Sequence, residues 1–186
     1  MAKALIIVNL QNDFFEGGAL PVPDGGAVVP VINGLIPLFD YVIYTRDWHP
    51  QNHVSFSTNP QFKEGSWPVH CVANTRGADF HPDLEFTLNA IVIDKGIDVS
   101  TDSLSGFSGT NLGECLHKFK VETVYITGLP ADYSVKATAL DAIKEGFTVY
   151  LVLDACRGLD RPAGALAQAV EEMKRAGVKI TSAAEI

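Results

Sequence analysis

An Asp-x-His pair and a later histidine are the residues whose types and spacing most clearly suggest metal chemistry. Asp47 and His49 are two positions apart, so both side chains lie on the same side of an extended backbone. His70, which follows Trp67 and Pro68 in a later loop, would bring a second imidazole. A carboxylate and two imidazoles bind zinc, iron or manganese, and three protein ligands leave positions for water or substrate. The alternative is a strand-end aspartate beside surface histidines.

The segment from about residue 46 to 89 contains these three residues and interrupts the regular hydrophobic pattern of the chain. It holds both tryptophans and most of the histidines. A long loop of this kind inside a domain is usually functional. Within it, His53 and Glu64 are candidates for a fourth metal ligand, although a polar residue in an exposed loop needs no special role.

The elements that must position this loop alternate between strands and helices. Continuous apolar runs predict strands at residues 4–10, 41–45, 90–94, 123–127 and 147–153, with a short edge strand at 178–181. Helical spacing predicts helices at residues 27–39, 111–119, 133–145 and 162–176. Gly146 and Gly177 fit helix C-caps, and Pro162 fits a first helical turn. The alternation predicts an α/β fold, a three-layer α/β/α sandwich around a mainly parallel, doubly wound sheet.

Ligands of open α/β sheets bind at the carboxyl ends of the strands. Asn9, Asp47, Lys95 and Ser134 all follow predicted strands. We therefore expect these residues, which are far apart in the sequence, to converge on one edge of the sheet.

Length, charge and cysteine content narrow the class of protein. With 186 residues, we expect one domain, residues 1–186, with a substantial core. A net charge of −8 without a basic run argues against nucleic acid and anionic membranes as partners, and no segment is long enough to span a bilayer. Cys71, Cys115 and Cys156 are widely spaced, which fits a reducing cytoplasm better than a disulfide framework. A cytoplasmic location is therefore expected.

Five motifs occur in the order found in nicotinamidases, a branch of the isochorismatase-like cysteine hydrolases. They are residues 8–14 (VNLQNDF), 47–50 (DWHP), 67–71 (WPVHC), 94–96 (DKG) and 127–135 (TGLPADYSV). Through these motifs the chain resembles that family over nearly its whole length, and the resemblance implies the isochorismatase-like hydrolase fold. It also implies the conversion of nicotinamide to nicotinate and ammonia, a reaction of NAD salvage.

The resemblance further implies a mechanism and roles for individual residues. In the family a thiolate attacks the carboxamide carbon and water then releases the acid. A carboxylate on the first strand transfers the proton, and a lysine supports both groups. Lys95 matches that lysine, and the Asp-His-His group matches the metal ligands. Phe14 and Trp67 match the aromatic residues that sandwich the substrate ring, with ordinary packing as the alternative for each.

Two catalytic positions of the family carry other residues in this chain. The carboxylate position falls at Asn9, whose amide cannot accept a proton at neutral pH. The nucleophile position holds Ser134, and a serine is a far poorer nucleophile than a thiolate unless a base activates it. No cysteine follows the turn at Gly128 that carries the nucleophile, so we do not expect a cysteine to replace it. Comparable losses cost several orders of magnitude in rate.

Pro130 is a third departure from the family. The resemblance places a cis peptide between Leu129 and Pro130. Because proline lowers the cost of a cis bond from about 3 to about 0.5–1 kcal/mol, we expect the bend to be kept. Proline has no N–H, so the oxyanion-hole donor that would act together with Ser134 is deleted. Losing one such donor costs about 3–4 kcal/mol of transition-state stabilisation.

We therefore expect a nicotinamidase-type hydrolase that binds a divalent metal ion and a small carboxamide such as nicotinamide, with weak or no turnover. Asn9 and Ser134 are either deliberate substitutions that trap substrate or residues of a natural relative that binds a planar ligand without converting it. Pro130 favours the natural relative. A scaffold with a structural metal is a third interpretation, and a homo-oligomer is left open by the sequence.

Overall fold

One sheet of six parallel strands runs through the computed structural model, which describes residues 2–186. The strands are β1 (Ala2–Val8), β2 (Tyr41–Asp47), β3 (Ile91–Lys95), β4 (Val121–Gly128), β5 (Thr148–Cys156) and β6 (Lys179–Thr181). They lie in the order β3-β2-β1-β4-β5-β6, and all neighbouring strands are parallel. The predicted α/β fold is confirmed, and the sheet is parallel throughout.

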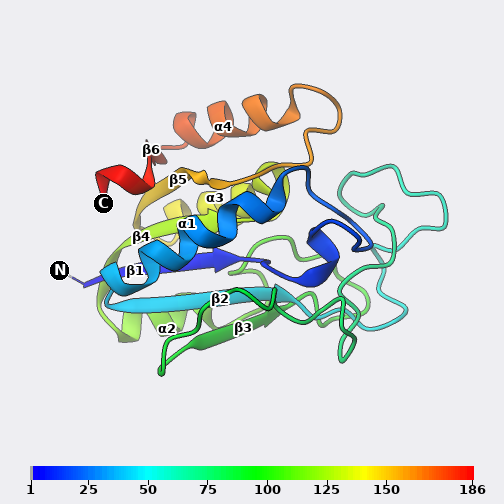
Figure 1. The fold of residues 1–186 in the computed structure, drawn as a ribbon, viewed down its shortest axis with the longest axis horizontal. Helices are drawn as coiled ribbons and strands as arrows, with labels where there is room; N and C mark the ends of the chain where they lie inside the picture. Colours follow the sequence, from blue (N-terminus) through cyan, green and yellow to red (C-terminus); the bar gives the residue numbers. More distant parts are fainter. Residues whose placement is uncertain (1) are drawn as a thin grey trace.

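Both faces of the sheet are buried, because alternate residues of the central strand enter two different cores. In β1, Leu5 and Ile7 belong to one buried cluster, whereas Ala4, Ile6 and Val8 belong to another. The helices that cover the two faces are α1 (Val28–Leu35) over the first cluster, and α2 (Leu112–Lys118), α3 (Lys136–Lys144) and α4 (Ala165–Arg175) over the second. Figure 1 shows the resulting layers, as predicted for an α/β/α sandwich.

α4 begins three residues later than predicted. It starts at Ala165 rather than at Pro162. The reason is the carboxylate of Asp160, whose Oδ1 accepts hydrogen bonds from the N–H groups of Gly164 at 2.9 Å and Leu166 at 3.0 Å. A side-chain oxygen in this position satisfies the free N–H groups of the first turn and so determines where the helix starts.

α1 and α3 are also shorter than the predicted helices. α1 is followed by a 3-10 turn, Ile36–Leu38, because Pro37 has no N–H to continue the α-helical hydrogen bonds. α3 is preceded by a π-helical turn, Ala131–Val135, which occupies the start of the predicted helix. Gly146 and Gly177 have φ of 88° and 102° directly after their helices, so the two predicted C-caps are confirmed.

The long loop predicted from the sequence lies over the carboxyl ends of the strands, at the right of Figure 1. In the described chain, residues 48–90 contain no helix and no strand of the sheet. Isolated bridges fix the segment: Gln11 pairs with Phe80, and Phe56 pairs with Trp67. The loop is therefore ordered by pairing with itself and with the end of β1.

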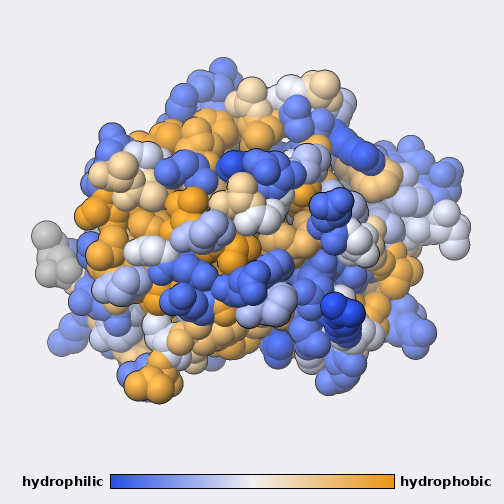
Figure 2. All heavy atoms as spheres, in the orientation of Figure 1, coloured by the Kyte–Doolittle hydropathy of each residue, from blue (hydrophilic) through white to orange (hydrophobic). Residues whose placement is uncertain are grey.

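The outer face of these loops is largely polar. In Figure 2, hydrophilic side chains predominate over the loops at the right, whereas apolar side chains gather over the helices and strands. Between residues 2 and 186, no helix combines the length and apolar character required to cross a membrane.

Gly128, at the end of β4, should not tolerate a side chain. A Cβ there would lie 2.1 Å from the carbonyl oxygen of Val8, and φ is +114°. We expect Gly128→Ala to lower the free energy of unfolding by more than about 4 kcal/mol. Gly146→Ala is the matched control, with φ of +88° and no atom within 4 Å of the added Cβ, and should cost about 1–2 kcal/mol. Urea denaturation of both variants measures the difference, and equal losses would contradict this account.

Candidate metal and ligand site

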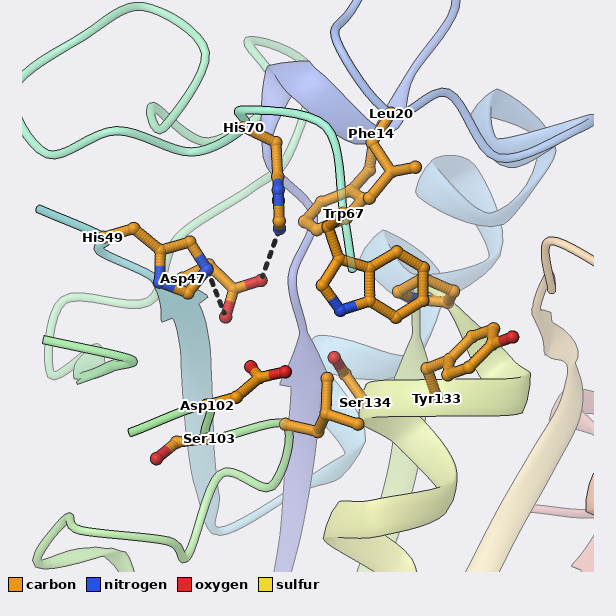
Figure 3. A pocket seen from close by; sticks show the side chains of 12 residues that line it. Phe14, Leu20, Asp47, His49, Trp67, His70, Asp102, Ser103, Tyr133 and Ser134 are labelled. Atoms are coloured by element: carbon orange, nitrogen blue, oxygen red, sulfur yellow. Dashed lines mark ion pairs between the residues drawn. The ribbon is translucent and has the colours of Figure 1, made fainter. Parts of the chain in front are cut away.

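Asp47, His49 and His70 converge at the carboxyl end of β2. Asp47 is the last residue of that strand. His49 follows in extended backbone, and its N–H donates to the carbonyl oxygen of Cys71 at 3.0 Å, which brings His70 alongside. One ligand atom from each of the three residues lies within 4.8 Å of the other two, and Figure 3 shows both imidazoles pointing toward the carboxylate. The structure thus brings together the three residues expected to bind a metal.

The outer ring nitrogen of each histidine is already hydrogen-bonded. Nδ1 of His49 lies 2.9 Å from the carbonyl oxygen of Gly96, and Nδ1 of His70 lies 2.8 Å from that of Pro68. Because a carbonyl can only accept, each Nδ1 carries a proton and each Nε2 is free to bind a metal. Each Nε2 is 3.8 Å from an oxygen of Asp47, near the roughly 3.4 Å that separates ligand atoms around a tetrahedral zinc. These residues fit a divalent ion.

Burial and nearby charges keep the three groups in the protonation states that a metal requires. Burial lowers the pKa of His49 to about 4, and burial also lowers the pKa of His70. Burial alone would raise the pKa of Asp47, but the Lys95 ammonium and the two imidazoles outweigh burial and lower it. A carboxylate and two neutral imidazoles are therefore present at neutral pH, as metal ligation demands.

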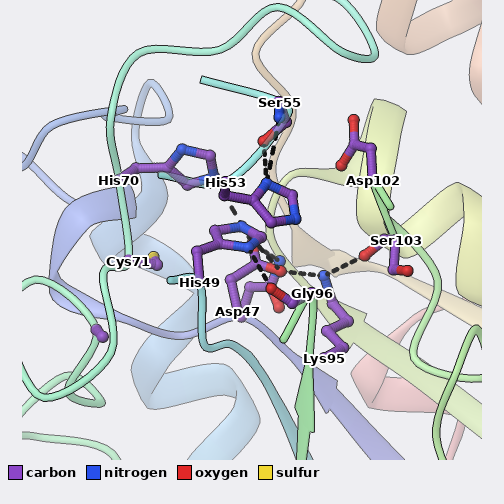
Figure 4. A network of polar contacts seen from close by, with 12 residues as sticks. Asp47, His49, His53, Ser55, His70, Cys71, Lys95, Gly96, Asp102 and Ser103 are labelled. Atoms are coloured by element: carbon purple, nitrogen blue, oxygen red, sulfur yellow. Dashed lines mark hydrogen bonds and ion pairs between the residues drawn. The ribbon is translucent and has the colours of Figure 1, made fainter. Parts of the chain in front are cut away.

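Asp47 is also the centre of a hydrogen-bond network that includes two of the family's catalytic positions (Figure 4). Lys95 Nζ donates to Asp47 Oδ1 and contacts the carbonyl oxygen of Ser103 at 3.5 Å. Asn9 Nδ2 donates to Asp47 Oδ2 at 3.3 Å. The other amide atom, Asn9 Oδ1, is buried and has no hydrogen-bond partner within residues 2–186. Both residues therefore hold the Asp47 carboxylate in place.

The two candidates for a fourth ligand lie elsewhere. His53 stacks on His49 with ring centroids 4.2 Å apart. Its Nδ1 lies 2.7 Å from Ser55 Oγ, and its Nε2 lies 3.1 Å from the carbonyl oxygen of Thr101. Glu64 is exposed in a surface loop. Neither residue belongs to the group of ligand atoms found among residues 2–186.

A pocket beside the metal group is lined by residues from several separate segments (Figure 3). The lining residues are Phe14, Leu20, Asp47, His49, Trp67, His70, Asp102, Ser103, Leu104, Pro130, Tyr133 and Ser134. Phe14 meets His70 edge-on with ring centroids 5.7 Å apart, and Trp67 meets Tyr133 edge-on at 4.8 Å. Aromatic walls beside a few polar groups are typical of sites for small planar ligands.

Ser134, the residue expected at the family's nucleophile position, lies in this wall, and the backbone N–H groups on both sides of Pro130 are already hydrogen-bonded. Ser134 belongs to the π-helical turn before α3, and Pro130 has no N–H. The N–H of Leu129 donates to the carbonyl oxygen of Val8 at 2.9 Å, and the N–H of Ala131 donates to that of Arg157 at 2.7 Å. Neither neighbour of Pro130 therefore has a free N–H.

The predicted cis peptide between Leu129 and Pro130 is wrong. Among residues 2–186 the cis bond is Arg161–Pro162, and the bond before Pro130 is trans. Trans remains the lower-energy form before proline by about 0.5–1 kcal/mol, and the hydrogen bonds on both sides of Pro130 are made with the trans bond in place.

Five lining residues were not singled out from the sequence: Leu20, Asp102, Ser103, Leu104 and Tyr133. Tyr133 directly precedes Ser134, so the sequence could have indicated that Tyr133 lies in the same turn beside the pocket. Asp102 and Leu104 lie in a loop without periodicity after β3, where no local pattern indicates a pocket. Only the packing of that loop against the turn before α3 brings them to the site.

A parallel α/β sandwich with a buried Asp-His-His group at its strand ends is the architecture of a metal-binding α/β enzyme site. Residues 3–185 match the isochorismatase domain, and the chain belongs to that family.

Known relatives refine this placement. The chain is 37% identical over 201 residues to the nicotinamidase of Acinetobacter baylyi, covering 98% of this chain and 94% of the relative. The structure of Pyrococcus horikoshii pyrazinamidase in complex with zinc is 43% identical, with a TM-score of 0.89 and coverage of 98% and 99%. That of PnC1 from L. infantum in complex with nicotinate is 36% identical, with a TM-score of 0.90 and coverage of 98% and 93%. The expected resemblance to nicotinamidases is confirmed.

Zinc should stabilise the folded protein through the Asp-His-His group. A ligand that binds only the native state stabilises it by about 2.7 kcal/mol at roughly 100 times its Kd, so we expect Zn²⁺ to raise Tm. His70→Ala should remove most of that rise, whereas His53→Gln should keep it. Thermal denaturation with and without zinc measures the effect.

Two outcomes would change the description of this site. If His53→Gln also removed the rise in Tm, His53 would have to be a fourth ligand. If chelation unfolded the protein outright, the metal would be structural, as in a scaffold, and would not serve a ligand pocket.

No cysteine lines the pocket among residues 2–186, and the two buried cysteines should react slowly with a thiol reagent. Burial raises the pKa of Cys156 to about 12 and raises the pKa of Cys71 well above its ordinary value. Cys115 is partly exposed. We expect a thiol reagent at neutral pH to modify Cys115 in the native protein, and Cys71 and Cys156 only after unfolding. Mass spectrometry identifies the modified residues, and fast labelling of either buried thiol would contradict the prediction.

Proposed function

We propose that this protein binds nicotinamide, or a closely similar planar carboxamide, beside a divalent metal ion and converts it weakly or not at all. The observation that carries the proposal is the position of Asn9. Its amide lies at the family's proton-acceptor position and is hydrogen-bonded to Asp47, so it offers Ser134 no base.

Asp102 does not take over this role in the structure. It is the other carboxylate that lines the pocket, but its Oδ2 accepts a hydrogen bond from the N–H of Gly65 at 2.8 Å. No hydrogen bond connects it to Ser134 in the described part of the chain, residues 2–186. A serine without a base remains protonated and is a poor nucleophile.

Stabilisation of the reacting oxygen is also weakened. Pro130 supplies no N–H, and the N–H groups of Leu129 and Ala131 are hydrogen-bonded within the fold. Loss of one oxyanion donor lowers the rate about 10²–10³-fold. The missing base and the missing donor therefore both favour ligand binding over turnover.

The binding half of the site supports the choice of ligand. Phe14 and Trp67 line the pocket beside the metal group (Figure 3), and Asp47, His49 and His70 would hold the ion. A bound divalent ion would supply a Lewis-acid contact for a ring nitrogen or a water molecule. Relatives in complex with zinc and with nicotinate support both parts of the proposal. Three unpaired cysteines are consistent with our expectation of a cytoplasmic location.

An active nicotinamidase is the second candidate. It is favoured by the retained Lys95 and metal group, and by relatives that are named nicotinamidases. Ammonia release from nicotinamide by purified, metal-loaded protein separates the two functions, and turnover near that of ordinary enzymes, about 1–10³ s⁻¹, would contradict our proposal.

Restoring the family residues should restore the reaction in a non-additive way. We expect Asn9→Asp, Pro130→Ala and Ser134→Cys each to have a small effect alone, and the triple variant to exceed the unmodified protein by at least about 10³-fold in kcat. Asn12→Asp is the matched control, because it makes the same chemical change in the loop after β1, where Asn12 Nδ2 donates to the carbonyl oxygen of Arg76. It should leave kcat unchanged. Full activity of Ser134→Cys alone would show that Asn9 and Pro130 do not limit the rate.

A further inference from the structure

The pocket is narrow in this structure. Its free volume is about 20 Å³, which accommodates a single water molecule. Phe14, Trp67 and Ser134 are only 2%, 4% and 3% exposed. A planar carboxamide is several times larger than water, so part of the wall must move before it can enter.

Residues 57–66, which we call the strap, lie beside the pocket, and the ring of Phe62 in the strap packs against the buried core. Most of the strap is exposed, and it appears as the turquoise loop at the right of Figure 1. At its base, the N–H of Ser57 donates to the carbonyl oxygen of Trp67 at 2.8 Å. At its tip, the N–H of Phe62 donates to the carbonyl oxygen of Ser66 at 3.0 Å, and the N–H of Ser66 donates to the carbonyl oxygen of Lys63 at 2.9 Å. The tip is therefore a compact turn that can move as one body about its base.

Two hydrogen bonds hold the tip against the pocket wall. The hydroxyl of Tyr133 donates to the carbonyl oxygen of Phe62 at 2.9 Å, and the N–H of Gly65 donates to Asp102 Oδ2 at 2.8 Å. Within residues 2–186, the remaining hydrogen bonds of residues 58–66 are made inside the strap, including that from the N–H of Asn59 to Ser57 Oγ at 3.1 Å. Tyr133 and Asp102 themselves line the pocket, so the strap is attached directly to the wall that it closes.

The Tyr133 hydroxyl also ties the strap to the loop after β5. It lies 3.0 Å from the carbonyl oxygen of Arg161, and its single proton is shared between two acceptors. The guanidinium of Arg161 lies 4.7 Å from the centre of the Phe62 ring, a weak cation–π contact at an exposed position. Removing the hydroxyl would therefore free the strap from two neighbours at once.

We propose that Tyr133 and Asp102 are positioning residues that latch the strap, and that a ligand enters and leaves when both hydrogen bonds break. Opening turns the strap about its base at Ser57 and Trp67 and frees the wall residues Tyr133 and Asp102 from it. The latch controls the rate of exchange rather than the chemistry at Ser134. Only the use of nicotinamide as the kinetic probe rests on the proposed function.

Hydrogen exchange of the protein without ligand tests the latch directly. Loss of one hydrogen bond should speed amide exchange within residues 57–66 about three- to tenfold, in Tyr133→Phe and in Asp102→Ala. Asp102→Asn keeps an oxygen that can accept from Gly65 and should restore slow exchange. Tyr150→Phe is the matched control, because Tyr150 lies on β5 and stacks on Tyr125 at 4.7 Å.

Stopped-flow fluorescence adds a readout that a merely structural role would not change. With Trp48→Phe as background, Trp67 is the single remaining tryptophan of the two in the chain. Tyr133→Phe should then raise both the association and dissociation rates of nicotinamide about three- to tenfold on zinc-loaded protein, with Kd changed by much less.

The latch is overturned if exchange in residues 57–66 is the same in Tyr133→Phe as in Tyr150→Phe, or if exchange rises equally throughout the chain. It is also overturned if nicotinamide binds and both rates are unaffected by Tyr133→Phe. Failure of nicotinamide to bind at all would count against the proposed function, while the exchange experiment still decides the latch.

Discussion

The buried carboxylate of Asp47 is the group on which the rest of the site depends. A buried charge is costly unless it is paired and hydrogen-bonded, and this one is surrounded by the Lys95 ammonium, the Asn9 amide and two imidazoles. These partners come from the ends of β1, β2 and β3 and from the long loop. Satisfying one carboxylate therefore holds together several segments that are distant in sequence.

The topology of the sheet explains why those segments meet. β1 lies between β2 and β4, so the chain extends from it in both directions and leaves a gap at the carboxyl end of the central strands. Both faces of β1 are buried, which prevents the strand from shifting its register without exposing apolar side chains. Burial of both faces of the sheet thus fixes the positions of Asn9, Asp47 and Ser134 at its carboxyl edge.

The structure separates the two halves of the site more clearly than the motifs do. The binding half keeps an Asp-His-His group with neutral imidazoles and apolar walls. In the half that would transfer the acyl group, the residue-9 amide serves Asp47, and the N–H groups on both sides of Pro130 bond within the fold.

The sequence by itself determined the layered α/β fold and the six strands to within a few residues, because continuous apolar runs are local patterns. The two-residue spacing of Asp47 and His49 is also local, and metal binding by these residues and His70 stays a prediction. Tertiary structure alone decided the trans bond before Pro130 and the contribution of Asp102 and Tyr133 to the pocket. Each of these depends on which hydrogen-bond partner arrives from a distant segment. Local sequence specifies a donor or an acceptor, whereas only the folded chain specifies its partner.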